Sequence, residues 1–206
     1  KLPDFSRFGP VERKPLRSVR RTIARRVARA WREIPHVTHN DVADITELEA
    51  FRRRHAEAVE ARGGKLTLTA LLLKAVAGVL AAHPRFNASL DAEREEIVYK
   101  GYFHLGVALD SERGLLVPPL RDVARQRLVE LAVELYELAE RGRAAEVSPA
   151  DMAGGSFTIT NVGPLGGTHF TPLINHPEVA ILGVGRARMQ PVVRGTGEAP
   201  EIVPRL

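Results

Sequence analysis

The sequence predicts an α/β (α+β) protein in which one mixed β-sheet layer packs against helices. Segments with helical periodicity and segments with strand periodicity follow one another without regular alternation, which indicates a mixed sheet. The chain has 206 residues, 44% hydrophobic and 27% charged, enough for one domain with a sizeable core. A central stretch that combines a hydroxyl-bearing strand with glycine-rich turns is the best candidate for a catalytic site.

Composition narrows the function classes. The chain contains no cysteine, so it has no disulfide framework, thiolate chemistry or zinc–cysteine site. No run approaches the roughly 20 apolar residues of a membrane span, and no apolar signal segment is present at the N-terminus. We therefore expect a cytoplasmic location without a membrane partner. The formal net charge of +5 is unevenly spread along the chain.

The central stretch covers residues 154–167, GGSFTITNVGPLGG. Its first half alternates, with Phe157 and Ile159 facing one way and hydroxyl residues facing the other: Ser156, Thr158 and Thr160. A strand that presents hydroxyls and then breaks into glycines can hold a hydrogen-bond donor beside bare backbone, where an oxygen gains charge during a reaction. An ordinary strand entering a turn is the alternative that the pattern alone favours.

The N-terminal residues 1–15 are predicted to form a linker or entry arm, and residues 16–206 the core domain. The arm contains prolines, a glycine and mixed charges without periodicity. Phe5 and Phe8 indicate that it docks on a surface.

A helix is predicted from Arg17 to Trp31, because apolar residues recur at every fourth position. Its other faces carry arginines, and no acidic residue lies between Glu12 and Glu33. This pattern permits binding to a polyanion such as nucleic acid. A solvated or oligomer-facing arginine surface is the alternative that we prefer, because base-stacking aromatic residues and a recognisable nucleic-acid module are missing. We expect no nucleic-acid partner.

Residues 34–45 are predicted to form a strand with unusually polar faces, after Pro35 has ended the preceding helix. Such a strand lines a channel or meets another subunit. His36 and His39 would lie on opposite faces of it, so they cannot both bind one metal ion. We expect no metal site.

Three longer helices and one short helix follow from the apolar patterns and end signals. Thr46 is predicted to cap a surface helix, in a capping box with Glu49, that ends at Gly63-Gly64. Residues 66–83 predict a helix that is buried nearly all round, and residues 128–139 an amphipathic one. Residues 148–151 predict a short helix with a serine cap and a proline in its first turn.

Further strands are predicted at residues 97–99, 103–109, 115–120, 178–184 and 189–193. Residues 103–109 and 115–120 form a hairpin-like pair around residues 110–114. Residues 178–184 are expected to be a strongly buried strand, and Gly195-Thr196-Gly197 a turn.

Several motifs, in this order and spacing, resemble the catalytic core of dihydrolipoamide acyltransferases, the E2 components of 2-oxoacid dehydrogenase complexes. They are residues 34–38 (IPHVT), 44–48 (DITEL), 84–87 (PRFN), 106–108 (GVA), 114–118 (GLLVP), 154–163 and 177–183 (PEVAILG). Residues 3–6, 168–170 and 203–206 look most like the members from pyruvate dehydrogenase complexes. The resemblance covers almost the whole chain.

The resemblance implies a fold like that of chloramphenicol acetyltransferase, with a mixed sheet, packed helices and trimers whose active sites lie between subunits. It implies transfer of an acetyl group from S-acetyl-dihydrolipoamide to coenzyme A, with a histidine as general base and a hydroxyl that stabilises the oxyanion. Thr160 stands at the position of that hydroxyl. An E2 for another 2-oxoacid remains an alternative.

The resemblance also implies substrates and partners. Coenzyme A and lipoamide, the latter on a separate lipoyl domain, are the expected substrates, and no metal is expected. The substrate and coenzyme A channel is assigned to His36, Thr38, Asn40, Asn87, Asn161 and His169. Homotrimers are expected to assemble into a cubic or dodecahedral core, with E1 and E3 components bound through the rest of the full-length chain. The location would be the mitochondrial matrix in a eukaryote.

One departure from the family pattern concerns the base. The family's H-x-x-x-D-G motif, which carries the histidine, occurs nowhere in these 206 residues. None of the seven histidines has an Asp-Gly pair at that spacing. We therefore expect this chain alone to be inactive, because a terminal segment is left out or lost. A catalytically inactive scaffold subunit of such a complex is the second hypothesis.

Overall fold

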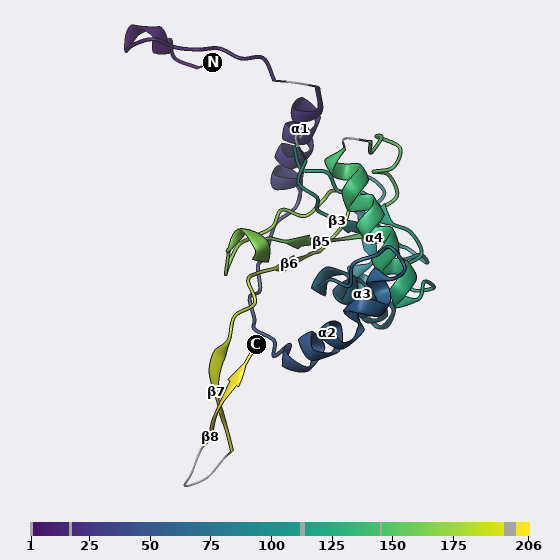
Figure 1. Cartoon of the computed structure of the whole chain (residues 1–206). Helices are drawn as coiled ribbons and strands as arrows, with labels where there is room; N and C mark the ends of the chain where they lie inside the picture. Colours follow the sequence, from purple (N-terminus) through teal and green to yellow (C-terminus); the bar gives the residue numbers. More distant parts are fainter. Residues whose placement is uncertain (1, 17, 112–113, 145, 196–200) are drawn as a thin grey trace.

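A four-stranded mixed sheet, with the order β4-β3-β5-β6, forms the centre of the molecule (Figure 1). The computed structural model describes residues 2–16, 18–111, 114–144, 146–195 and 201–206. The strands are β3 (Leu105–Val107), β4 (Pro119–Leu120), β5 (Phe157–Asn161) and β6 (Ile181–Val184). The mixed sheet with packed helices that the sequence predicts is confirmed.

The register of the sheet places β5 between two parallel neighbours. Gly106 of β3 is opposite Thr158, and Thr160 is opposite Gly183 of β6. β3 and β4 are antiparallel, and an isolated bridge joins Leu109 to Leu116. The hairpin-like pair predicted around residues 110–114 is therefore confirmed, although its regular strands are shorter than expected.

Helices cover one face of this sheet and build the core with it. They are α2 (Thr46–Glu60), α3 (Leu68–Ala82) and α4 (Leu128–Arg143), and α3 and α4 lie together beside the sheet in Figure 1. β5 presents Phe157 and Ile159 to this side, as its alternation predicts. The fully buried apolar side chains of the core come from several elements: Leu66, Leu73, Leu105, Leu120, Val123, Leu131 and Ile159.

The arm and one hairpin project from opposite ends of the body (Figure 1). The arm holds the 3₁₀ turn η1 (Phe5–Arg7) and leads into α1 (Ser18–Glu33), which confirms the predicted first helix. Phe8 is 86% exposed, so the arm does not dock on its own chain through this residue. β7 (Gln190–Arg194) pairs with β8 (Glu201–Arg205), a strand that the sequence did not predict.

A second small hairpin pairs β1 (Ala88–Asp91) with β2 (Glu96–Tyr99). β2 matches the predicted strand at residues 97–99, whereas β1 was not predicted. Two further 3₁₀ turns, η2 (Pro84–Phe86) and η3 (Gly163–Leu165), follow α3 and β5. The predicted turn at residues 195–197 lies mostly outside the described residues, although Gly195 has φ +89°. Within the described ranges, no helix is both long and apolar enough to cross a membrane.

The polar strand predicted at residues 34–45 is wrong. This stretch is extended, but it pairs with none of the strands in the described part of the chain. Isolated contacts hold it instead, among them Ile45 N–H donating to the Leu206 carbonyl at 2.9 Å. Val37 is 94% exposed. The expectation that this stretch meets another subunit remains a prediction.

The capping box predicted at Thr46 is also wrong. Thr46 is the first residue of α2, and its hydroxyl accepts a hydrogen bond from Leu206 N–H at 2.9 Å. Glu49 pairs with Arg52 and Arg53 instead of reaching back to the start of the helix. The Thr46 hydroxyl therefore bonds Leu206, which is distant in sequence, and not a backbone N–H group of its own helix.

Three other predictions need smaller corrections. Residues 149–152 form a turn and no helix, because Ser148 and Asp151 bond each other's backbone N–H groups without a continuing helical run. α3 is buried on one side only, and Val79 is 54% exposed. β6 starts at Ile181, three residues later than predicted, and is partly buried because it is the edge strand of the sheet.

Candidate active site

Thr160 lines a pocket of about 660 Å³ on the sheet face opposite α3 and α4. The pleat of β5 places Thr158 and Thr160 on this side, because alternate side chains of a strand point to opposite faces. The walls are largely apolar and come from α1, β6 and the segment of residues 170–176. A hydroxyl in such a place acts in a low dielectric, where hydrogen bonds to charge are strong.

A buried carboxyl group is hydrogen-bonded to one residue of the pocket wall. Glu178 is only 3% exposed, and its Oε1 accepts a hydrogen bond of 3.1 Å from the side-chain amide of Asn175, which lines the pocket. Burial raises the pKa of Glu178 to about 7, against the opposing effects of Thr158, Asn175 and the positive charge of Lys100. Burial in turn lowers the pKa of Lys100. Glu178 is not among the site residues predicted from the sequence, although a glutamate inside an apolar strand pattern is a usable signal.

Close contacts explain why glycine is required at several positions around β5. A Cβ on Gly155 would lie 3.2 Å from Glu178 Oε1, so this glycine leaves room for the carboxyl. A Cβ on Gly163 would lie 2.9 Å from the Gly185 carbonyl. Gly166 has φ +93°, a conformation that favours glycine, and ends η3. The backbone of the glycine-rich turn after β5 thus packs closely against the residue that follows β6.

Two of the predicted channel residues lie at the edge of the pocket. His36 Nε2 accepts a hydrogen bond of 3.0 Å from Ile174 N–H, and Ile174 lines the pocket. The His36 ring also lies 5.7 Å from the Trp31 ring, centroid to centroid. Thr38 donates to the Thr171 hydroxyl at 3.2 Å. These contacts fasten residues 36–38 to the segment that forms one pocket wall.

The other predicted channel residues are not brought to this pocket. Asn87 is buried, and its amide donates to the carbonyls of Lys100 and Tyr102 at 2.8 and 2.9 Å. Asn161 bridges Thr69 of α3 and the backbone of η3, with hydrogen bonds of 3.2 and 2.9 Å. Asn40 and His169 are exposed. None of the six predicted channel residues lines the pocket itself, and His36 and Thr38 are hydrogen-bonded to the segment of residues 170–176 that forms one of its walls.

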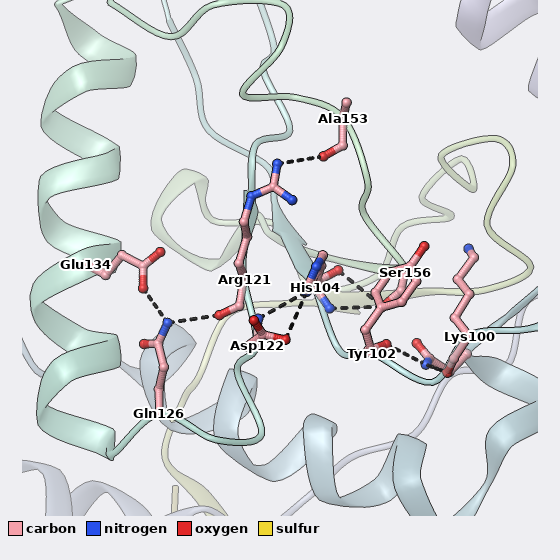
Figure 2. Close-up of polar contacts among 10 residues, drawn as sticks. Lys100, Tyr102, His104, Arg121, Asp122, Gln126, Glu134, Ala153 and Ser156 are labelled. Carbon is pink, nitrogen blue, oxygen red and sulfur yellow. Dashed lines mark hydrogen bonds and ion pairs between the residues drawn. The ribbon is translucent and has the colours of Figure 1, made fainter.

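A polar network joins the beginnings of β3 and β5 (Figure 2). The Ser156 hydroxyl donates to the His104 carbonyl and accepts from His104 N–H, each at 3.2 Å. His104 Nδ1 accepts from Asp122 N–H at 3.1 Å, which leaves the proton of neutral His104 on Nε2. Ser156 and His104 therefore hold strands together and do not line the pocket.

Histidine side chains most often act as general bases, and few of them reach the Thr160 pocket. Of those in the described part of the chain, only His176 lines it, and its Nε2 lies 3.6 Å from Glu33 Oε2. Throughout the ranges that the structure describes, no group of three or more His, Cys, Asp or Glu side chains could hold a metal ion. The polar side chains of the pocket wall thus include Thr160, Asn175 and His176.

Comparison with known proteins identifies the family. Residues 8–205 match the family of 2-oxoacid dehydrogenases acyltransferase (catalytic domain). The chain belongs to this acyltransferase family. The dihydrolipoyllysine-residue acetyltransferase components of the pyruvate dehydrogenase complexes of Haemophilus influenzae and Pseudomonas aeruginosa are 42% and 45% identical over 97% of the chain. The chain spans 36% and 37% of the lengths of these two relatives.

Solved structures agree with this assignment. A structure of the cubic core of the pyruvate dehydrogenase multienzyme complex is similar with a TM-score of 0.92 at 43% identity, over all of this chain and 83% of the other. The Azotobacter vinelandii dihydrolipoamide acetyltransferase (E2p) is similar with a TM-score of 0.91, also at 43% identity, over 100% and 84% of the two chains. That structure belongs to an investigation of a serine, a histidine and an asparagine in the catalytic mechanism of the enzyme. The acyltransferase family predicted from the motifs is confirmed.

Proposed function

We propose that this chain is the catalytic core of a dihydrolipoamide acetyltransferase that transfers an acetyl group from S-acetyl-dihydrolipoamide to coenzyme A. The observation that carries the proposal is the Thr160 hydroxyl in the apolar pocket beside β5. The relatives named for this activity match nearly the whole chain. Acetyl transfer is preferred over transfer of other acyl groups because these relatives belong to pyruvate dehydrogenase complexes.

The reaction needs a donor at the position of Thr160. The sulfur of coenzyme A attacks the thioester carbon and forms a new C–S bond, and the carbonyl oxygen becomes an oxyanion. The bond to the lipoamide sulfur then breaks, and the thiol proton of coenzyme A ends on the departing sulfur. Thr160 donates a hydrogen bond to the oxyanion, which is strongest in the transition state. The proposal assigns the base to none of the histidines of this chain.

We also propose that the chain assembles into a trimer and that trimers join into a larger core. Support comes from the cubic core that the similar pyruvate dehydrogenase structure forms. Exposed apolar side chains on the β7–β8 hairpin and in residues 37–42 suit contacts with other copies, among them Val37, Val42, Val193 and Ile202. E1 and E3 components would bind through other parts of the full-length protein.

The test measures acetyl transfer by the full-length protein that contains this chain, with Thr160→Ala and Thr160→Ser as a matched pair. Thr160→Ala should lower kcat by about 10²–10³-fold, the usual effect of losing one oxyanion donor. KM should change little, because the bond forms mainly in the transition state. Thr160→Ser keeps the hydroxyl and should retain most of the activity.

Two results would count against the proposal. An unchanged kcat in Thr160→Ala would remove the role given to Thr160. A well-assembled full-length protein without transferase activity would favour the scaffold hypothesis.

A further inference from the structure

Three side-chain contacts join residues 33–38 to residues 171–176 at the edge of the Thr160 pocket. As the residue number rises along the first segment, the number of its partner in the second segment falls, so the two segments run in opposite directions. We call these three contacts the clasp. Its pairs are Glu33 Oε2 with His176 Nε2 at 3.6 Å, His36 Nε2 with Ile174 N–H at 3.0 Å, and Thr38 Oγ1 with Thr171 Oγ1 at 3.2 Å.

The clasp connects two walls of the pocket. One wall is α1, which ends at Glu33, and the other is the segment of residues 170–176. Neither wall belongs to one of the described sheets. Residues 170–175 form no helix or strand, and Ala30 is the one buried side chain among those that the structure describes in α1. The contacts of the clasp therefore help to set the distance between the two walls.

His36 makes the central contact of the clasp, and both of its ring nitrogens are in use. Nδ1 lies 2.8 Å from the Ile34 carbonyl oxygen, which can only accept a hydrogen bond, so Nδ1 carries the proton of the neutral ring. Nε2 then presents its lone pair to the Ile174 N–H. The Trp31 ring lies 5.7 Å away, centroid to centroid, and limits how far the imidazole can turn. Since neither nitrogen is left for a substrate, His36 affects the reaction through the wall.

Ile174 is the residue through which His36 acts on the pocket. Its backbone N–H lies outside the described strands, so no strand partner supplies it with a carbonyl. Ile174 lines the pocket, and so do the next two residues, Asn175 and His176. Without the His36 acceptor, this part-buried N–H must turn to water, which favours an outward shift of the wall. Thr160 is held separately, on β5 between two neighbouring strands.

We propose that His36 is a positioning residue that holds residues 171–176 at the distance from α1 that a bound substrate requires. This inference rests on the proposed function. Because the wall can move without Thr160, loss of the His36 contact weakens substrate binding and leaves the oxyanion donor in place. Such a change raises KM and spares kcat, the opposite of the effect expected for Thr160→Ala.

The test compares His36→Asn with His36→Gln in the full-length protein. The asparagine amide lies at the same distance from the backbone as Nδ1 of histidine, so it can donate to the Ile34 carbonyl but does not reach Ile174. The glutamine amide lies at the distance of Nε2, so its oxygen can accept from the Ile174 N–H. Both variants lose the ring, so the effects of losing the contact with Trp31 are common to the pair.

Acetyl transfer from S-acetyl-dihydrolipoamide to coenzyme A gives the first readout. His36→Asn should raise the KM of at least one of the two substrates about three- to tenfold, the effect of one hydrogen bond, while kcat stays within about twofold. His36→Gln should keep KM and kcat within about twofold of the natural values. His83→Asn is the control, because His83 is exposed at the end of α3 and does not line the pocket, and it should change neither value.

Hydrogen exchange measured by mass spectrometry gives a second readout that needs no activity. Peptides containing residues 171–176 should exchange faster in His36→Asn than in the natural protein, because the Ile174 N–H has lost its acceptor. His36→Gln and His83→Asn should exchange like the natural protein. If His36→Asn does not fold, Thr38→Val removes the neighbouring contact of the clasp and should speed exchange in the same peptides.

Three results would overturn the inference. They are equal KM values in His36→Asn and His36→Gln, a lower kcat at unchanged KM in His36→Asn, and unchanged exchange of residues 171–176 in that variant or in Thr38→Val used in its place. Each of them leaves the proposed function standing, because acetyl transfer by the natural protein is the reference. A natural protein that transfers no acetyl group would instead refute the proposed function, and hydrogen exchange would still test the clasp.

Discussion

Gly106 and Thr158 are register partners on the parallel strands β3 and β5, and the absence of a side chain on Gly106 brings them close together. A Cβ on Gly106 would lie 3.1 Å from Thr158 Oγ1 and 2.9 Å from Val117 Cγ1. Both of these neighbours line the pocket that contains Thr160. Gly106 therefore determines how tightly β3 packs behind the pocket.

Gly106→Ala should destabilise the protein by about 1–3 kcal/mol, because the added methyl group overpacks a rigid region. Urea denaturation measures the change. Gly78→Ala is the matched control, since Gly78 lies inside α3 and a Cβ there meets no atom within 4 Å. This control should stabilise by about 0.5–1 kcal/mol, because alanine favours a helix over glycine. Equal effects of the two substitutions would contradict the packing argument.

Lys74 is expected to hold the turn between β4 and α4. Its Nζ donates to the carbonyls of Val123, Ala124 and Gln126 at 3.3, 2.9 and 2.6 Å. Lys74→Met keeps the length of the side chain but removes the donors, and should cost about 2–3 kcal/mol in unfolding free energy. Lys65→Met is the control at an exposed lysine and should change stability by less than about 0.5 kcal/mol. Similar stability of the two variants would show that the turn does not need Lys74.

Glu178 should make stability depend on pH. Its folded-state pKa of about 7 lies above its ordinary value of 4.5, so the folded protein holds this proton more tightly than the unfolded chain. The resulting stabilisation is fully present below pH 4.5 and is lost as the pH rises through 7. The loss amounts to about 3 kcal/mol, from 1.36 kcal/mol for each pKa unit.

Glu178→Gln remains neutral and should lack this loss, so its stability relative to the natural protein should rise between pH 5 and pH 8. Urea denaturation at several pH values measures the difference. Glu137→Gln, at an exposed position on α4, should follow the natural protein across the same range. If the Glu178→Gln curve also runs parallel to that of the natural protein, the carboxyl titrates normally.

The β7–β8 hairpin should contribute to assembly. Val193 and Ile202 are cross-strand partners that are 63% and 68% exposed in the single chain. Ile202→Lys would place a charge in a contact that the proposed oligomer buries, and should shift the sedimentation coefficient toward smaller species. Glu201→Gln on the same strand should leave the distribution unchanged. An oligomer that tolerates Ile202→Lys would show that this hairpin face stays in solvent.

Local patterns predicted the parts of the fold that local rules control. The alternation of β5 separates Phe157 and Ile159 from Thr158 and Thr160 because side chains of a strand alternate between faces whatever lies around them. α1 and α4 follow from apolar residues at helical spacing. The position of Thr160 in the family pattern, together with this alternation, places its hydroxyl on the pocket face.

Tertiary contacts decided the rest, because they join residues that are far apart in the sequence. Residues 34–45 have the composition of a strand, but a strand needs a partner backbone, and none of the described strands pairs with them. Thr46 lost its capping role to Leu206, which no local window contains. Glu178 is a strand residue by pattern, yet burial by the surrounding fold raises its pKa, against the opposing hydrogen bonds of Thr158 and Asn175. The sequence determines that a carboxyl stands at this position. Its pKa depends on how far folding removes it from water, so only the tertiary structure decides it.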